Sequence, residues 1–518
     1  MQKYDYIGLQ NGSDIRGVAI DGVPGEKVTL TDEAASRLVK GFIYWLSEKT
    51  GVTASKLTIS VGRDPRLSGL DIADSIESTL QHNGVQVLSA GLASTPAMFM
   101  STVFEQFDCD GAIMITASHL PFNRNGLKFF SAEGGLNKGD ITDIIIFAES
   151  DYILGTMERG NFRDIKKIDL MDVYSAHLRD LIIKGVSGAD SPSCNSAASD
   201  TPLAGLKITV DAGNGSGGFY ASEVLAPLGA DISSSQFLQP DGNFPNHAPN
   251  PENKEAMASI CAKVKESGSD LGLIFDTDVD RSSAVDEHGR EIARNSIVAM
   301  AAALIADEHP GTTVVTDSIT SRQLTEYLEG PLGLKHLRFQ RGYRNVINKA
   351  IDLNAAGIDS QLAIETSGHA AYKENYFLDD GAYLATKIVI AAAKLKAQGR
   401  GISEMISDLE DPAEAMELRF PIKGSDFKAY GDKVLADLDS LVRSGGLAGA
   451  SLVEPNYEGV RINFTQPEIS GWLLLRKSLH DPIMPLNVES DVAGGCEKIL
   501  AEIKPFLTGF NQLDTSKL

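Results

Sequence analysis

One strand–turn–helix pattern occurs three times in this sequence and limits the classes of fold that the chain can adopt. In each copy, an apolar run rich in β-branched residues leads into a small or polar turn, and apolar residues spaced three and four apart follow. The copies begin at Leu57 (LTISVGRDPRLSGL), Leu206 (LKITVDAGNGSGG) and Thr312 (TTVVTDSITSRQL). We therefore predict three related α/β domains with mixed, mostly parallel sheets and helices on their faces.

The chain is too long for a single hydrophobic core, and the second and third copies begin about one typical domain length apart. The small, polar stretch SGADSPSCNSAASDTPLA predicts a linker. The last hundred residues lack the repeated unit, and a helical stretch followed by RINF and WLLL indicates a smaller α+β domain. The predicted segments are 1–187, a linker at 188–204, 205–308, 309–416 and 417–518.

Charge and composition exclude several classes of protein. The net charge of −23 argues against binding to nucleic acid or to an anionic membrane. No run approaches the ~20 apolar residues of a membrane helix, and the N-terminus lacks the basic and apolar regions of a secretory signal. The four cysteines stand singly, which favours reduced thiols. We expect a cytoplasmic protein whose partners are small molecules, anionic ones included if the site supplies positive charge.

Three aspartates follow a buried-looking strand in the stretch LGLIFDTDVDRSS. Asp276, Asp278 and Asp280 are spaced by two, so in an extended chain their side chains share one face. Carboxylates that close repel one another unless a cation lies among them, and oxygen ligands suit Mg²⁺ or Ca²⁺. Glu287 stands at position twelve of an EF-hand loop, but Arg281 occupies the position that needs glycine. The pattern predicts a Mg²⁺ site, with a solvated acidic turn as the alternative.

The stretch MITASHLPFNRNGLKFF displays a serine, a histidine and a lysine between apolar segments. Adjacent residues point apart, so His119 is not expected to be a general base for Ser118, and no G-x-S-x-G elbow marks a serine hydrolase. Near a divalent cation and basic groups such as Lys128, the Ser118 hydroxyl would suit carrying a phosphoryl group. A polar loop that caps a helix is the alternative.

A glycine pattern competes with this interpretation. Gly213, Gly215 and Gly218 fit the dinucleotide fingerprint G-x-G-x-x-G after a strand, and Asp241 lies at a tolerable distance for a ribose contact. Many strand-to-helix turns need small residues only for close packing, so both a nucleotide site and a structural turn remain open.

Polar residues also cluster after two later strands. Glu365, Ser367 and His369 alternate after one apolar strand, which suits a site for a sugar with several hydroxyls. The stretch GWLLLRKSLHDP ends in a group of donors that can hold a phosphate, namely Arg476, Lys477, Ser478 and His480. A hydrogen-bonded loop and a solvated basic turn are the alternatives.

Together these stretches resemble the α-D-phosphohexomutase family, the phosphoglucomutases and phosphomannomutases. The matches run in order over nearly the whole chain: SDIRG from Ser13, VGRDPRLSG from Val61, STP from Ser94, TASHLPFNRNGLK, PDGNFPNHAPNPEN from Pro240, DTDVDR, ETSGH and GWLLLRKSLHDP. The match from Pro240 assigns the preceding glycine turn to this fold rather than to a dinucleotide site.

The resemblance implies four domains around one central cleft and a phosphoryl transfer between a phosphoserine and hexose phosphates, through a hexose 1,6-bisphosphate, with glucose 1,6-bisphosphate as activator. It places the phosphoserine at Ser118, and the Mg²⁺ ligands at Ser118 and the three aspartates. The implied catalytic residues are Ser118, Lys128, His119 and Arg16. The implied substrate-binding residues are Arg281, Arg344, Glu365, Ser367, His369, Arg476, Ser478 and His480.

Some positions depart from the family pattern. Leu120 replaces an Asn in the serine loop, Thr277 and Val279 replace glycines between the aspartates, Ile364 replaces a glycine before Glu365, and His480 stands where a smaller residue is usual. The SGH form of the sugar loop resembles that of enzymes acting on glucose and mannose phosphates. A phosphoglucosamine mutase and a catalytically weak paralogue that senses sugar phosphates are the alternatives.

Overall fold

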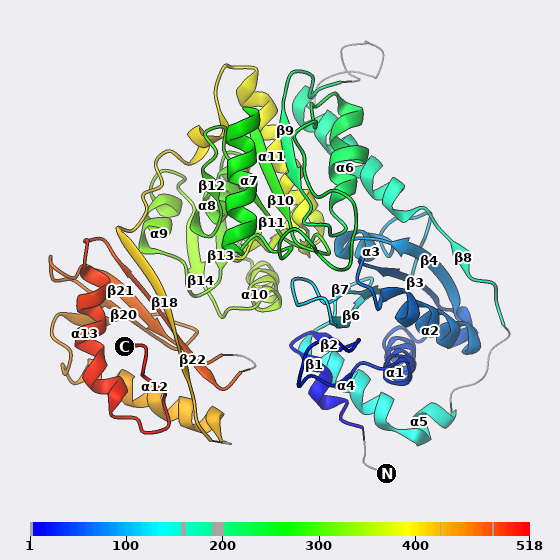
Figure 1. Ribbon diagram of the computed structural model, residues 1–518, viewed down its shortest axis with the longest axis horizontal. Helices are drawn as coiled ribbons and strands as arrows, with labels where there is room; N and C mark the ends of the chain where they lie inside the picture. Colours follow the sequence, from blue (N-terminus) through cyan, green and yellow to red (C-terminus); the bar gives the residue numbers. More distant parts are fainter. Residues whose placement is uncertain (1–3, 157–161, 189–200, 425, 479–480) are drawn as a thin grey trace. The chain divides into compact units, whose positions relative to one another are not determined.

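The computed structural model describes residues 4–156, 162–188, 201–424, 426–478 and 481–518 (Figure 1). Backbone contacts divide the chain into two compact units. The first unit combines Met1–Leu304 with Ser367–Met405, and the second combines Ile305–Thr366 with Ile406–Leu518. Each unit is therefore built from two separate lengths of chain. Most of the predicted linker at 188–204 lies outside the described residues.

An eight-stranded mixed sheet forms the N-terminal part of the first unit. Its strands are β1 (Gln10–Asn11), β2 (Asp14–Val18), β3 (Thr58–Arg63), β4 (Gln86–Leu92), β5 (Gly111–Ile115), β6 (Arg124–Ser131), β7 (Gly134–Gly135) and β8 (Lys166–Lys167). The order is β1-β2-β6-β5-β3-β4-β8, with β7 paired to β6. The helical elements are η1 (Ile7–Leu9), α1 (Asp32–Thr50), η2 (Ala54–Lys56), α2 (Gly69–His82), α3 (Thr95–Met100), α4 (Lys138–Glu149) and α5 (Asp151–Thr156). One buried cluster joins α1, α2 and α4 to the sheet and includes Phe42, Ile76, Ile113 and Ile144.

A four-stranded sheet follows in the same unit. Its strands are β9 (Ile208–Asp211), β10 (Leu271–Phe275), β11 (Ser282–Val285) and β12 (Glu291–Ile292), in the order β12-β11-β10-β9. Its helical elements are α6 (Leu170–Ser187), η3 (Tyr220–Leu225), η4 (Ala226–Leu228), α7 (Lys254–Ser267) and α8 (Asn295–Ala306). The helix predicted after β9 is a short π-helix followed by a 3₁₀ turn. Pro227 lacks a backbone donor and Gly229 has a left-handed φ, so a regular helix cannot continue there.

The remaining part of the first unit returns from the second. It holds the antiparallel pair β16 (Ala370–Tyr372) and β17 (Leu378–Asp379), the 3₁₀ turns η5 (Lys373–Asn375) and η6 (Ile402–Ile406), and the helix α11 (Gly381–Lys396). Helix α11 contacts α6, which the sequence analysis had placed in the first domain, and both helices lie beside the four-stranded sheet (Figure 1). Helix α6 also packs against η3 and against α3, so it lies between the helical elements of the two sheets.

The second unit contains the third strand–helix repeat. Its parallel strands are β13 (Thr313–Thr316), β14 (Lys335–Arg338) and β15 (Leu362–Ile364), and its helices are α9 (Arg322–Glu329) and α10 (Tyr343–Ala355). Strand β13 pairs with β14 on one side and with β15 on the other. The chain order thus reverses beside β13, and ligands of parallel sheets commonly bind at such a reversal, beyond the carboxyl ends of the strands.

The C-terminal part of the second unit is α+β, as predicted. Its antiparallel sheet has the order β18-β22-β21-β20-β19. The elements are β18 (Glu414–Pro421), α12 (Phe427–Arg443), β19 (Ala450–Leu452), β20 (Val460–Phe464), β21 (Gly471–Leu475), β22 (Ile483–Ser490) and α13 (Gly495–Thr508). Both helices bury apolar side chains against one face of the sheet, with Leu438, Ile462, Leu473 and Ile503 in one core.

Parallel pairing is less extensive than the sequence predicted. The sheets are mixed, but in the first unit the parallel centre is extended by hairpin strands such as β6 and β11, which pair antiparallel with their neighbours. A hairpin needs only a short turn, whereas a parallel neighbour needs a helical crossover. The hairpin turns after β5 and β10 carry Ser118 and the three aspartates. The antiparallel hairpins therefore determine where these residues lie.

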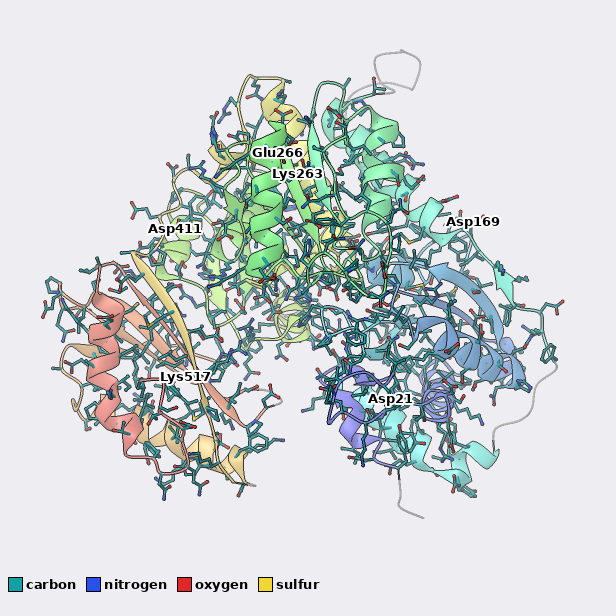
Figure 2. All side chains as sticks on the ribbon, in the orientation of Figure 1. Asp21, Asp169, Lys263, Glu266, Asp411 and Lys517 are labelled. Atoms are coloured by element: carbon teal, nitrogen blue, oxygen red, sulfur yellow. The ribbon has the colours of Figure 1, made fainter. Side chains whose placement is uncertain are left out.

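Helix α7 carries two charged residues that Figure 2 labels, Lys263 and Glu266. Lys263 Nζ lies 3.7 Å from Glu266 Oε2, one helical turn away. Among the helices of the described segments, none has the length and apolarity needed to cross a membrane. Cys109, Cys261 and Cys496 are free thiols, and Cys194 lies outside the described residues.

Candidate active site

The loop between β5 and β6 presents Ser118 in a strained backbone conformation. Its φ of 48° lies in the left-handed region, which non-glycine residues seldom adopt. The Ser118 backbone N–H donates to Thr116 Oγ1 at 2.9 Å, and the residue is only 5% exposed. A strained residue that its surroundings hold in place is common at functional sites.

The turn between β10 and β11 brings the three aspartates together. Asp276, Asp278 and Asp280 are all buried, and one carboxylate oxygen of each lies within 4.8 Å of the others. The chain does not stay extended here, because Val279 takes a φ of 66° and turns the backbone. The prediction that the carboxylates converge is therefore confirmed, but a hairpin turn rather than strand alternation brings them together.

This cluster has the chemistry of a cation site. Asp278 Oδ1 and Asp280 Oδ1 are buried and have no hydrogen-bond partner among the described residues, a costly state that a cation would relieve. Burial and the neighbouring Asp280 carboxylate raise the pKa of Asp276 well above its usual range. Burial also opposes the charge on Asp280, but Lys128, His369 and Arg281 outweigh it and lower the pKa of that carboxyl. The residues present therefore fit a hard divalent cation held by oxygen atoms.

Ser118 lies directly beside this cluster. Its Oγ donates to Asp276 Oδ2 at 2.9 Å and accepts from Arg281 Nη2 at 3.0 Å. Arg281 Nη2 is also 3.0 Å from Asp276 Oδ2. The hydroxyl, a carboxylate and a guanidinium thus meet in one buried place, although 158 residues separate Ser118 from Asp276.

Lys128 and Arg16 extend from neighbouring strands of the first sheet. Lys128 Nζ lies 3.1 Å from Asp278 Oδ2 and forms an ion pair with Asp280. The Arg16 guanidinium donates to Asp14 Oδ2 at 2.8 Å and to the Thr116 carbonyl at 2.5 Å. Lys128 therefore contacts the acidic cluster, and Arg16 contacts the loop that carries Ser118.

His119 lies closer to the serine than the sequence analysis expected. Its Nδ1 is 3.4 Å from Ser118 Oγ, because the left-handed backbone of Ser118 turns the two side chains toward each other. Arg281 Nη2 donates to the same nitrogen at 2.6 Å. The positive charge of Arg281, with burial, lowers the pKa of His119 to about 2, so the ring is neutral at physiological pH. This nitrogen is already occupied and weakly basic, so His119 is a poor general base for Ser118.

His369 joins the acidic turn from the following chain segment. Arg281 and His369 form an antiparallel β-bridge. His369 Nε2 lies 3.7 Å from both Asp280 Oδ1 and Asp379 Oδ2, and its Nδ1 is 2.8 Å from Ser367 Oγ. The structure therefore brings two of the predicted sugar-binding residues, Ser367 and His369, to the edge of the aspartate cluster.

Two residues in this region were missed by the sequence analysis. Thr95 donates its backbone N–H to the Asp278 carbonyl at 2.8 Å and its hydroxyl to the Asp278 carboxylate. Thr95 belongs to the STP motif at the start of α3. This motif resembles one of the family, but the sequence assigned no role to Thr95. Asp379 lies next to His369, and its signal was the acidic pair DD that precedes α11.

The predicted residues of the second unit lie at the carboxyl ends of its strands. Glu365 follows β15, is 4% exposed, and accepts from the Gly342 N–H at 2.6 Å. Burial and the nearby Glu365 raise the pKa of Asp317, which follows β13, to about 7. Arg344 lies in the first turn of α10. Glu365 is thus next to the reversal of strand order, where a ligand site is expected.

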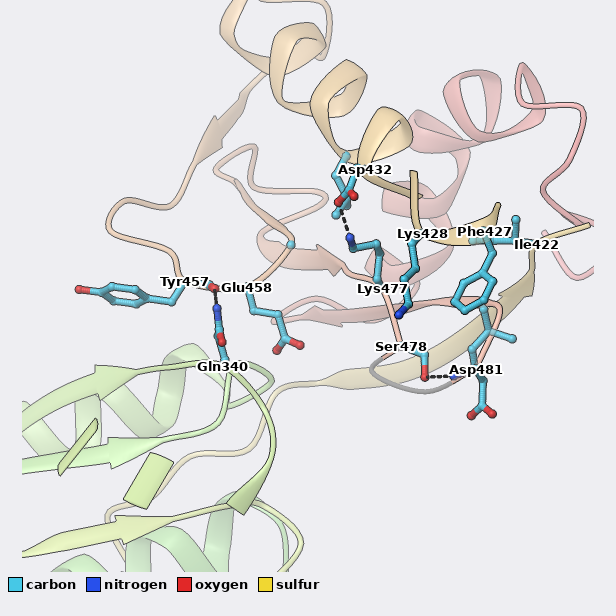
Figure 3. A pocket seen from close by; sticks show the side chains of 13 residues that line it. Gln340, Ile422, Phe427, Lys428, Asp432, Tyr457, Glu458, Lys477, Ser478 and Asp481 are labelled. Atoms are coloured by element: carbon cyan, nitrogen blue, oxygen red, sulfur yellow. Dashed lines mark hydrogen bonds and ion pairs between the residues drawn. The ribbon is translucent and has the colours of Figure 1, made fainter. Parts of the chain in front are cut away.

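The predicted phosphate-binding residues lie after β21. Arg476 is buried, which lowers the pKa of its guanidinium, and Ser478 lines a pocket of about 390 Å³ (Figure 3). In that pocket Lys477 pairs with Asp432, and Ser478 Oγ accepts from the Asp481 N–H at 3.2 Å. His480 lies outside the described residues.

The glycine pattern has a structural explanation. A Cβ atom at Gly215 would lie 2.7 Å from the Thr277 carbonyl, and one at Gly218 would lie 2.1 Å from the Leu238 carbonyl. The protein's own backbone therefore occupies the space that these glycines leave. Glu287 accepts hydrogen bonds from Ser403, away from the aspartates, so the EF-hand alternative has no twelfth ligand at this site.

Comparison with known proteins agrees with this geometry. Family models for domains I, II and III of phosphoglucomutase/phosphomannomutase, each described as alpha/beta/alpha, match residues 9–149, 189–289 and 293–412.

Named relatives cover nearly the whole chain. A phosphomannomutase/phosphoglucomutase of Pseudomonas syringae pv. tomato is 28% identical over 94% of this chain and 92% of its own length. A phosphoglucomutase of Neisseria gonorrhoeae is also 28% identical, over 94% of each chain. A phosphoglucosamine mutase of Lactobacillus delbrueckii subsp. bulgaricus is 27% identical over 84% of this chain and 91% of its own length.

Solved structures show the same fold. A phosphoglucomutase/phosphomannomutase family protein from Burkholderia thailandensis superposes with a TM-score of 0.75 at 24% identity, covering 96% of each chain. The acidic turn, the serine loop and three matched domain models together show that the chain belongs to the α-D-phosphohexomutase family, the family of phosphoglucomutases and phosphomannomutases.

Proposed function

We propose that this protein interconverts hexose 1-phosphates and hexose 6-phosphates, of glucose, mannose or both, through a phosphoserine at Ser118. The observation that carries this proposal is the position of Ser118 Oγ among buried charged side chains. It lies 2.9 Å from Asp276 Oδ2 and 3.0 Å from Arg281 Nη2. The family assignment makes the protein a phosphohexomutase. The contacts of Ser118 Oγ with Asp276 and Arg281 support it as the hydroxyl that would carry the phosphoryl group.

In the proposed reaction, phospho-Ser118 transfers its phosphoryl group to a sugar hydroxyl. The bond between phosphorus and Ser118 Oγ breaks as the bond to the sugar oxygen forms, and the sugar hydroxyl loses its proton. The resulting hexose 1,6-bisphosphate reverses its orientation in the site. It then returns its other phosphoryl group to Ser118, which regenerates the phosphoenzyme. Glucose 1,6-bisphosphate would therefore activate a dephosphorylated enzyme by phosphorylating Ser118.

We propose Mg²⁺ as the cation, held by Asp276, Asp278, Asp280 and an oxygen on Ser118. When bound, Mg²⁺ would offset negative charge on the transferred group. Arg281 donates to the Ser118 oxygen and would add a second positive charge beside the transferred group.

Lys128, with Arg16 and His119 nearby, is the group that we propose to move the proton of the sugar hydroxyl. The contact of Lys128 with Asp278 supports its place at the reacting centre. The neutral His119 ring would act as a hydrogen-bond acceptor rather than as a base.

The remaining predicted residues are proposed to bind the sugar phosphate. Glu365, Ser367 and His369 would hold sugar hydroxyls, and Arg344, Arg476, Ser478 and His480 would hold the phosphate that is not reacting. The position of Glu365 at the carboxyl end of β15 supports this role.

Free thiols at the described cysteines support a cytoplasmic, reducing location.

Substitution of Ser118 tests the proposal. We expect Ser118→Ala to lower mutase activity by roughly 10³-fold or more, because no other group replaces the nucleophile. A coupled assay of glucose 6-phosphate formation, primed with glucose 1,6-bisphosphate, measures this loss. Ser131→Ala on β6 is the matched control and should retain activity, because the hydrogen bond of its hydroxyl among the described residues is one accepted from the Glu133 N–H. Full activity in Ser118→Ala would contradict the mechanism.

The same assay separates the alternatives. Trials with the 1-phosphates of glucose, mannose and glucosamine rank the substrates, and a preference for glucosamine would support the activity named for the Lactobacillus relative. No turnover of any of the three, combined with binding of hexose phosphate, would support a sensor. Intact mass shows whether a phosphoryl group is attached, and peptide mapping shows whether it is at Ser118.

A further inference from the structure

Arg66 connects the segment after β3 to the loop that carries Ser118. Its side chain is fully buried, and the whole residue is 1% exposed. Its Nε donates to Asp64 Oδ2 at 3.1 Å, and its Nη1 and Nη2 donate to backbone carbonyls of the serine loop. The carbonyls belong to Pro121 at 2.7 Å, Arg124 at 3.0 Å, Leu120 at 2.7 Å and Ser118. The five N–H donors of one guanidinium are thus all engaged, which three donors on a lysine cannot reproduce.

The partner carboxylate extends this network to the other side of Ser118. Asp64 Oδ2 accepts from Thr116 Oγ1 at 2.7 Å, and Thr116 Oγ1 in turn accepts from the Ser118 N–H at 2.9 Å. Arg66 holds the Ser118 carbonyl directly. Both backbone polar groups of Ser118 are therefore bound to a single buried ion pair and its neighbour.

These bonds bear on the conformation that aims the hydroxyl. The left-handed backbone is sterically disfavoured for a residue other than glycine, so Ser118 needs neighbours that hold it there. If its carbonyl and N–H were released, the backbone would relax to an ordinary region and Oγ would leave Asp276. A shift of about 1 Å in a reacting atom can slow catalysis by about 100-fold.

The loop between η4 and α7 covers Arg66. The ring centroid of Phe244 lies 5.3 Å from Arg66 Cζ. A Cβ atom at Gly242 would lie 2.4 Å from the Pro65 carbonyl and 2.9 Å from Arg66 Cα, so the two backbones are in close contact. This packing excludes water from the guanidinium and confines it to its present position.

We propose that Arg66 is a positioning residue for phosphoryl transfer: it holds the backbone of the serine loop so that the Ser118 hydroxyl faces Asp276. Arg66 acts through Ser118 and does not itself contact the reacting atoms. This inference rests on the proposed function, because it concerns where the phosphorylated hydroxyl is held.

A single-turnover experiment with Arg66→Lys tests this role. Dephosphorylated protein is mixed with saturating glucose 1,6-bisphosphate and Mg²⁺, and intact mass follows the phosphorylation of Ser118. In this step a phosphorus–oxygen bond of the bisphosphate breaks, the bond to Ser118 Oγ forms, and the serine proton passes to the sugar oxygen. We expect the rate constant to fall about 100-fold. The Kd for the bisphosphate, measured by calorimetry, should stay unchanged, which separates positioning from substrate binding.

Arg63→Lys is the matched control. Arg63 is the last residue of β3, and its guanidinium donates to the Asp64 carbonyl at 3.1 Å, but it has no bond to the serine loop among the described residues. Its rate should equal that of the unmodified protein. A normal rate in Arg66→Lys would overturn the positioning role and leave the proposed function intact, whereas turnover by Ser118→Ala would overturn the function itself.

Thr116→Val provides the second variant if Arg66→Lys does not fold. It removes only the hydroxyl that accepts from the Ser118 N–H, and we expect the phosphorylation rate to fall about tenfold with an unchanged Kd. An unchanged phosphorylation rate in Thr116→Val would overturn the proposal. A loss of rate in either variant that merely follows the fraction of unfolded protein, measured by circular dichroism, would also overturn it.

Discussion

At the scale of the residue, Val279 shows how the acidic turn stores strain. It is a fully buried, β-branched residue with a φ of 66°, where L-residues other than glycine are disfavoured. The resemblance to the family places a glycine at this position. The Val279 carbonyl accepts from the Gly381 N–H at 3.1 Å, so a contact with the start of α11 helps to hold the turn. Ser118 and Val279, one in each loop of the site, are thus both held in the left-handed region.

This strain predicts an inverted order of stability between two variants. We expect Val279→Gly to be more stable than Val279→Ala by about 1 kcal/mol, because glycine removes the left-handed penalty that alanine keeps. Both variants lose the buried methyl groups of valine, so the comparison cancels most of the packing loss. The free energy of unfolding in urea measures the difference.

Val285 on β11 is the matched control, being fully buried but outside the residues with positive φ. There, glycine should be less stable than alanine by about 0.5–1 kcal/mol. The same order at both positions would show that Val279 is not strained.

At the scale of the element, a buried bond ties α6 to the start of α11. Tyr174 Oη lies 2.7 Å from each carboxylate oxygen of Asp380, which is the N-cap of α11 and also accepts from the Tyr383 N–H at 2.8 Å. Burial raises the pKa of Asp380 to about 6, although these hydrogen bonds oppose the rise. Above the unfolded-state pKa of about 3.9, the folded protein therefore binds this proton more tightly than the unfolded chain does. The contribution of Asp380 to stability falls as pH rises from about 4 through 6.

Tyr174→Phe should make this pH dependence stronger. At pH 8 the Asp380 carboxylate is charged and loses a donor, so we expect a loss of about 1.5–3 kcal/mol in the free energy of unfolding. At pH 5, Asp380 is largely protonated and the loss should be smaller. Urea unfolding at both pH values measures the two losses.

Tyr220→Phe is the control for this comparison. Tyr220 is also buried, but its hydroxyl pairs with the neutral Thr386 Oγ1 at 3.0 Å. Its loss should therefore be similar at pH 5 and pH 8. An equal loss at both pH values in Tyr174→Phe would show that the charge on Asp380 does not determine the stability of this contact.

At the scale of the whole molecule, the chain consists of two compact units, and the serine loop and the aspartates all belong to the first. A cation that binds the folded first unit stabilises that unit by mass action, by about 2.7 kcal/mol at a concentration 100 times its Kd. The second unit, Ile305–Thr366 with Ile406–Leu518, contains none of the three aspartates.

Calorimetry of the full chain should therefore show two unfolding transitions, of which Mg²⁺ raises only one. EDTA should reverse the shift, and Asp278→Asn should abolish it because it removes one charged ligand. Asp411→Asn, at an exposed position of the second unit, is the control and should leave the shift intact. An equal rise in the temperatures of both transitions, or a rise that persists in Asp278→Asn, would contradict binding of Mg²⁺ at the three aspartates.

Much of the fold and part of the site could be predicted from short stretches of sequence. The first and third strand–helix repeats appear as β3 with α2 and as β13 with α9, because periods of two and of 3.6 are local properties of the chain. The second repeat is interrupted by Pro227, which shows that an apolar period alone does not ensure a regular helix. The order of the motifs identified the family, and the residue types identified a cation site.

The sequence alone determined which residue types are available for the proposed reaction: a hydroxyl and three carboxylates in turns that follow strands, and several cations. Tertiary structure decided their geometry, since Ser118 and Asp276 are neighbours only because two distant hairpin turns meet. It also decided that Val279 turns the acidic loop, that His119 is neutral beside Arg281, and that Arg66 holds the serine loop. These features depend on burial and on contacts between residues far apart in the chain, which no local pattern of residue types records.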